Sequence, residues 1–106
     1  MIRMRKEEDA QVGVLERHAL DHPGSVYEIR FAEGDAYLCR WANGEYCDND
    51  EAMDSPKYEE WYELDYEVKT ILKKGPNKDP KYDFIQISRK HMPSEVLCGD
   101  EVVYSV

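Results

Sequence analysis

The sequence has no long apolar run and none of the glycine, serine or histidine signatures of common enzymes. A membrane-spanning helix needs about 20 consecutive apolar residues, so we expect no membrane segment. The first residues, MIRMRKEEDAQ, are charged where a signal peptide requires an apolar core, which favours a cytoplasmic location. Without a GxSxG, HExxH, P-loop or Rossmann glycine pattern, we predict a protein that is not an enzyme and uses no cofactor.

Cysteine is scarce and poorly spaced for disulfides or zinc. Cys39, Cys47 and Cys98 form an odd set without a Cys-x-x-Cys pair, so free thiols are expected in a cytoplasmic protein. His18 and His22 together with Cys39 and Cys47 would make four zinc ligands, yet neither pair has the two-to-four-residue cysteine step that structural zinc sites usually contain. We therefore predict that no zinc is bound.

Part of the acidic segment resembles a calcium-binding loop. Asp48, Asp50 and Glu59 stand at positions one, three and twelve of an EF-hand-like loop, but Met53 occupies the position where such a loop needs glycine. No flanking helices are expected either. The prediction is again no metal.

The composition is that of a single domain spanning residues 1–106, with residues 1–11 as a candidate flexible arm. A chain of 106 residues can bury a sizeable core. With 23 acidic and 14 basic residues, its net charge is −9. Such a charge repels nucleic acids and anionic membranes and favours basic partners, so we expect no direct nucleic-acid or membrane binding.

Turn residues divide the chain into short β-prone segments. Period-two alternation is clearest over residues 62–72, where the even positions are mostly apolar and the odd positions mostly charged. "NG" at 43–44 predicts a type I′ hairpin, which would place Cys39 and Cys47 on opposite sheet faces. "CGDE" could close a final hairpin through a II′ turn. One short helix is expected at 55–61, with Ser55 as N-cap. The expected strands are residues 12–20, 26–31, 36–41, 62–72, 82–88, 95–98 and 101–106.

This pattern predicts an all-β, mainly antiparallel fold, either a small SH3-like barrel or a strongly bent sheet. The predicted core comprises Tyr27, Ile29, Phe31, Leu64, Tyr66, Val68, Ile85 and Ile87. The phrase "VYEIRFAEGDAYLCRW" within residues 12–41 resembles the opening strands of SH3-like barrels of the Tudor and KOW type. That resemblance implies an SH3-like fold and does not carry over a ligand.

The net charge is concentrated in one window. Residues 45–67 hold ten acids and one base, Lys57, giving −9, so the rest of the chain is neutral. Burial explains the aromatic residues of this window, but ordinary surfaces mix both signs of charge. A row of carboxylates along a strand could imitate a line of phosphates.

Two non-catalytic functions follow. The first is an inhibitor or decoy of the nucleic-acid-mimic type, similar in size and charge to phage anti-restriction and anti-CRISPR proteins, which docks on a basic nucleic-acid-binding protein such as a nuclease. The alternative is an SH3-like interaction module that binds a peptide or an assembly subunit. The predicted partner-binding residues are Asp48, Asp50, Glu51, Asp54, Glu59, Glu60, Trp61, Glu63, Asp65 and Glu67.

Overall fold

The computed structural model describes residues 6–76 and 83–106. The described residues form two helices and six strands, with bounds α1 Lys6–Ala10, α2 Val12–Asp21, β1 Tyr27–Arg30, β2 Ala36–Asp48, β3 Glu60–Lys73, β4 Phe84–Ser88, β5 Glu95–Cys98 and β6 Glu101–Ser105. Neither helix has the length or apolar content that crossing a bilayer requires.

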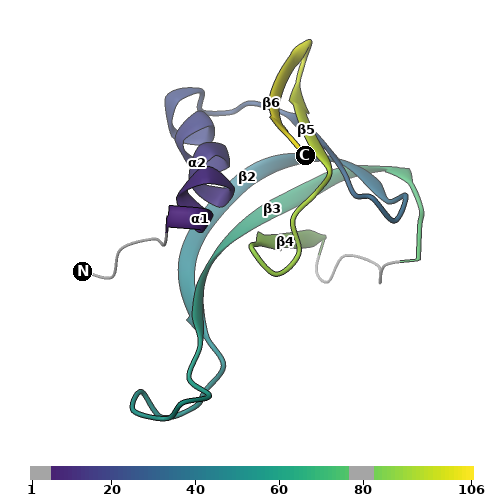
Figure 1. Cartoon of the computed structure of the whole chain (residues 1–106). Coiled ribbons are helices and arrows are strands. Elements are labelled where there is room, and N and C mark those ends of the chain that lie inside the picture. The colour runs from purple at the N-terminus through teal and green to yellow at the C-terminus, as the bar shows by residue number, and fades with distance from the viewer. Residues whose placement is uncertain (1–5, 77–82) are drawn as a thin grey trace.

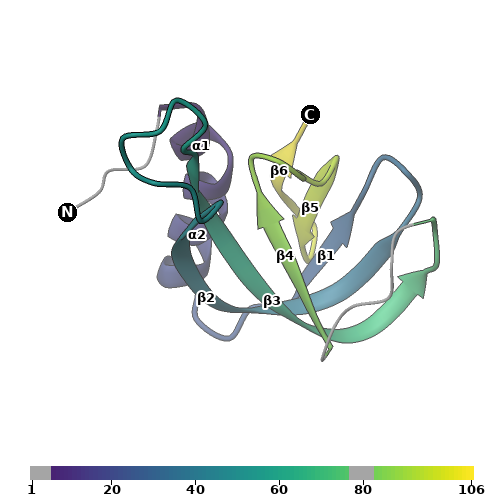
Figure 2. The same cartoon turned by 90° about the horizontal axis from the view of Figure 1, so that it is seen from below.

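All six strands belong to one antiparallel sheet in the order β4-β3-β2-β1-β5-β6. The sheet bends strongly, and its edge strands β4 and β6 do not pair with each other, so it is not a closed barrel (Figures 1 and 2). The prediction of a mainly antiparallel fold is confirmed in its bent-sheet form.

The predicted core is confirmed. Seven of its eight members are buried in one cluster, and Val68 packs against that cluster. Along β3 the even residues Leu64 and Tyr66 are fully buried while Glu63 and Asp65 are partly exposed, as the period-two pattern requires. Strand β3 therefore has one face toward the core and one toward solvent.

The prediction of a strand at 12–20 is wrong, because these residues form α2. Val12, Leu15 and Ala19 lie three and four residues apart, so they share one helix face, and all three are buried in the core. Ala, Leu, Glu and Arg also favour helix in this segment. The helix ends before Pro23, with the His22 N–H bonded to the His18 carbonyl at 2.9 Å.

The N-terminal segment also differs from a flexible arm over the part that the structure describes. Residues Lys6–Ala10 form α1, and the Glu8 side chain is 2% exposed. Residues 1–5 lie outside the described residues.

The predicted helix at 55–61 is wrong. Ser55, Pro56 and Lys57 lie in turns, where the Ser55 hydroxyl accepts the Lys57 N–H at 3.1 Å. Pairing of Asp48 with Glu60 extends the sheet to residue 60 and leaves only residues 49–59 for the connection. Sheet pairing thus takes the residues that the helix would have needed.

The predicted hairpin turn at Asn43-Gly44 is also wrong, because both residues lie inside β2 and pair with Asp65 and Leu64. A Cβ atom added at Gly44 would lie 2.6 Å from the Tyr62 hydroxyl, so glycine permits a close approach here. The real connection between β2 and β3 is the 49–59 loop. The II′ turn at the final hairpin fits better, since Gly99 has a φ of 60°.

A register irregularity between Trp41 and Asn43 changes which residues of β2 face the core. Cys39 is buried in the core, whereas Cys47 lies with Glu45 and Glu63 on the other side of the sheet. The two thiols are on opposite faces as predicted, but the bulge is the reason, not a hairpin turn. All three cysteines are free.

Candidate functional site

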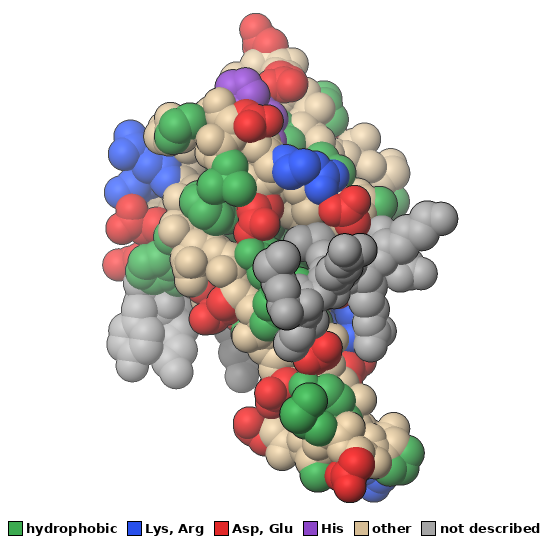
Figure 3. Space-filling view, turned by 90° about the vertical axis from the view of Figure 1, so that its left-hand side faces the viewer, with side chains coloured by type: hydrophobic (Ala, Val, Ile, Leu, Met, Phe, Trp, Pro, Cys, Tyr) green, Lys and Arg blue, Asp and Glu red, His purple; other side chains and the backbone are tan. Residues whose placement is uncertain are grey.

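The acidic window of the sequence coincides with one structural unit. Residues 45–67 comprise the end of β2, the 49–59 loop and the first half of β3, and we call this unit the acidic hairpin. Its tip, with the 49–59 loop, extends away from the rest of the sheet at the lower end of Figure 1, while residues 63–67 pair with β4. In Figure 3 the same end forms a lower lobe with acidic side chains around it.

The acids of this hairpin divide between two faces of the strands. Glu60 shares a face with Tyr62, which packs toward the core and helix α2, and Asp48 pairs with Glu60 on that side. We call the opposite side the outer face; it carries Glu63 and Asp65. The predicted residues therefore do not form one continuous row.

Four predicted residues lie at the tip of the hairpin. Asp48 ends β2 and accepts the Asp50 N–H at 2.8 Å, and both are exposed. Glu51 and Asp54 are exposed in the loop. Asp50 has a φ of 63°, a left-handed conformation that Asp tolerates in turns. These carboxylates are open to any approaching partner.

Glu59 and Glu60 lie at the base of the loop and are already engaged. Glu59 forms ion pairs with Arg89 at 3.1 Å and Lys90 at 2.7 Å. These bonds lower the pKa of the Glu59 carboxyl. The Glu60 carboxylate accepts the Tyr58 hydroxyl at 2.9 Å, a bond that raises the pKa of that tyrosine.

Trp61 stands on the outer face and is half-buried. Its indole N–H donates to Glu63 at 3.3 Å, and the Lys90 ammonium lies 3.7 Å from the centroid of its ring. This contact is a cation–π interaction, in which the ring quadrupole attracts the charge. The predicted anchor is thus in contact with a cation of its own chain.

Further along β3, Glu63 and Asp65 have no such cation. No lysine or arginine in the described ranges forms an ion pair with either carboxylate. Burial, followed by the neighbouring carboxylates, raises the pKa of both groups. Glu67, by contrast, is paired with Lys69 at 2.6 Å, which lowers its pKa.

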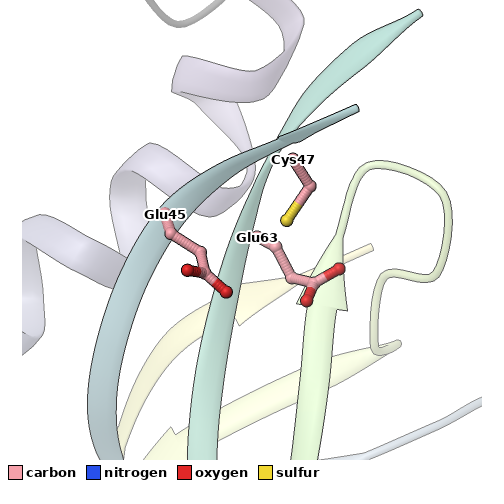
Figure 4. Close-up of side chains that lie close together, drawn as sticks. All are labelled: Glu45, Cys47 and Glu63. Atoms are coloured by element: carbon pink, nitrogen blue, oxygen red, sulfur yellow. The ribbon is translucent and has the colours of Figure 1, made fainter. Parts of the chain in front are cut away.

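Sequence reasoning missed Glu45, which pairs directly across the sheet from Glu63. Ligand atoms of Glu45, Cys47 and Glu63 lie within 4.8 Å of one another (Figure 4). Burial, together with the neighbouring acids, raises the pKa of Cys47 to about 11, so its thiol stays protonated at neutral pH. The only sequence signal for this cluster was that Glu45 belongs to the acidic window.

One basic and one acidic residue that sequence reasoning also missed, Arg89 and Glu8, hold the hairpin to the body. Where β4 ends at Ser88, the edge of β3 continues without a strand partner on that side. The Arg89 guanidinium donates to the Glu60 carbonyl at 3.1 Å, and Glu8 of α1 accepts the Tyr62 N–H at 2.8 Å. Glu8 and Arg89 face each other at 3.6 Å. This pair of side chains replaces a missing strand.

No family model, no curated protein and no solved structure matches the chain. The resemblance to Tudor- and KOW-type barrels therefore gains no support beyond its sequence phrase.

Proposed function

We propose that the protein is a non-catalytic inhibitor or decoy whose acidic hairpin docks on a basic, nucleic-acid-binding protein such as a nuclease. One observation carries this proposal. The entire net charge of the chain, −9, lies within residues 45–67, and those residues form one hairpin whose tip projects from the body while residues 63–67 pair with β4. A solvated surface would not need such segregation, because dispersed charge gives the same solubility with less repulsion.

The arrangement supports electrostatic docking in two ways. A hairpin that extends from the body can enter a groove that a flat surface could not reach. Its strand acids are held by paired backbone, so little ordering entropy is lost when they meet a partner. A concentrated negative field also speeds encounter with a positive groove.

Binding that depends on this field must weaken as salt rises, because ions screen exposed charges beyond about 10 Å at 0.1 M. The experiment is capture of proteins from a cell extract on the immobilised chain, at low and at high salt, followed by mass spectrometry. A variant with Asp50 and Asp65 changed to Lys serves as the comparison. A basic protein held by the wild type, released by salt and lost by the variant supports the proposal.

An interaction module that binds through an apolar groove would behave differently. Its partner would persist at high salt and would bind the reversed variant equally well. That outcome would favour the alternative of an ordinary peptide- or subunit-binding module.

A further inference from the structure

The outer face of the sheet has a hollow where β2, β3 and β4 lie side by side. Its volume is about 420 Å³. We call it the carboxylate hollow, and the lining residues that matter here are Asn43, Glu45, Glu63, Asp65, Phe84 and Gln86. The strand pairs Glu45↔Glu63 and Asp65↔Gln86 fix its floor. A site of this size can hold one long side chain.

The charged residues that line the hollow are all acidic. Three of the lining residues are acids, and no described base forms an ion pair with Glu45, Glu63 or Asp65. Like charges directly opposite on neighbouring strands destabilise a sheet. A cation in the hollow would relieve this repulsion, so the chain is complementary to a positive group there.

The remaining walls suit a planar cation. Phe84 offers an aromatic surface, while Asn43 and Gln86 offer amide oxygens as further acceptors. A guanidinium is planar, stacks on aromatic rings and donates in parallel to carboxylates, and it is less strongly hydrated than an ammonium. Arginine therefore matches this lining better than lysine.

The same face already holds a cation in a comparable setting. Lys90 lies 3.7 Å from the ring centroid of Trp61 and 2.7 Å from the Glu59 carboxylate. An aromatic ring and a carboxylate together thus bind a basic side chain on this surface. The carboxylate hollow repeats that combination, with Phe84 as the ring and no basic side chain of the described residues paired with its acids.

We infer that the carboxylate hollow receives an arginine side chain of the basic partner. This inference rests on the proposed function and specifies where on the acidic hairpin the partner is recognised. A metal ion is the competing occupant, since Glu45, Cys47 and Glu63 could supply three ligands. Cys47 does not line the hollow, whereas Phe84 does, and an aromatic ring suits a guanidinium rather than a metal ion.

The test is an NMR titration of the ¹⁵N-labelled protein with N-acetyl-arginine amide. N-acetyl-citrulline amide, which has the same shape without the charge, is the matched probe. We expect arginine to shift the amide signals of Asp65, Phe84 and Gln86 selectively, and citrulline to shift them at least fivefold less. Changing Glu45 and Glu63 together to Gln should weaken arginine binding at least fivefold. Changing exposed Asp21 and Asp100 to Asn should leave it unchanged.

Three results would overturn the inference: equal shifts with citrulline, shifts spread evenly over the hairpin tip, or unchanged binding by the Gln variant. Selective Zn²⁺ binding that excludes arginine would replace it with a metal site. Dispersed amide signals of the Gln variant establish that it is folded. If any of these results appeared together with salt-sensitive capture of a basic protein by the hairpin, the proposed function would stand. Only the inference that the carboxylate hollow binds arginine would then be wrong.

Discussion

Replacing Arg89 with Met tests how the acidic hairpin is held to the body. In the native protein Arg89 donates to the Glu60 carbonyl at 3.1 Å and faces the Glu8 carboxylate at 3.6 Å. Glu8 is 2% exposed, so its charge has almost no access to water. Removing the guanidinium takes the Arg89 cation away from that buried carboxylate and breaks two hydrogen bonds, to the Glu60 carbonyl and to the Glu59 carboxylate.

The size of the effect follows from burial. Breaking a buried ion pair by removing one partner costs about 3–5 kcal/mol. Because the Arg89 side chain is 20% exposed, water can partly replace it, and we expect the lower end, about 3 kcal/mol. Glu8→Gln should cost only about 1 kcal/mol, since an amide oxygen can still accept the Tyr62 N–H. The double variant should cost less than the sum of the two.

The assay is urea denaturation followed by circular dichroism, with the slope m checked for constancy across variants. Coupling of about 1.5 kcal/mol or more between the two sites is expected for groups in one network. A loss below about 1 kcal/mol for Arg89→Met, or strict additivity in the double variant, would refute the argument that this pair replaces a strand.

Three further predictions concern the core, the pH dependence and the cysteines. Leu15→Ala should lower the free energy of unfolding by about 2–5 kcal/mol, while Leu20→Ala, at a position 60% exposed, should change it by less than about 0.5 kcal/mol; equal effects in urea would contradict the burial of α2. The pKa values of Glu63 and Asp65 are raised in the folded state. As pH falls, the folded protein therefore binds protons at these two carboxylates before the unfolded chain does. The free energy of unfolding that they contribute should rise as pH falls from neutral toward 4.5, the ordinary pKa of Glu63. Thermal melts of a Glu63→Gln, Asp65→Asn variant should lack this component, and an identical pH profile would contradict it. A chelator with a reductant should leave the melting temperature nearly unchanged, whereas a fall of more than about 10 °C, equivalent to roughly 1–2 kcal/mol, would reveal a structural metal or disulfide.

Local sequence pattern predicted much of the sheet. β1 and β3 follow from alternation between turns, and the core residues follow from the same period. Helix α2 was missed because residues 12–20 are rich in Val and Leu, which suit either structure in a short segment, and the three-to-four-residue spacing was overlooked.

Other errors came from long-range contacts that no local pattern reveals. Asn43 and Gly44 together strongly predict a hairpin turn. In the structure, however, the missing side chain of Gly44 leaves room for Tyr62 of the neighbouring strand. Glu8 and Arg89 are 81 residues apart in sequence, and only the end of β4 explains why they meet. The sequence predicts the acidic hairpin as a charged unit. It does not predict the bulge after Trp41, which sets the register that pairs Glu45 with Glu63.

The most direct test of the central claim is the salt dependence of affinity for the purified partner that the chain captures. The dissociation constant would be measured at several salt concentrations for three proteins. These are the wild type, a variant with Asp50 and Asp65 changed to Lys, and a control with Asp21 and Asp100 changed to Lys, which alters net charge equally outside the hairpin. We predict that the wild type and the control bind with the same steep salt dependence, and that the hairpin variant loses affinity and most of that slope. Equal affinity and slope for all three proteins would contradict docking through the acidic hairpin.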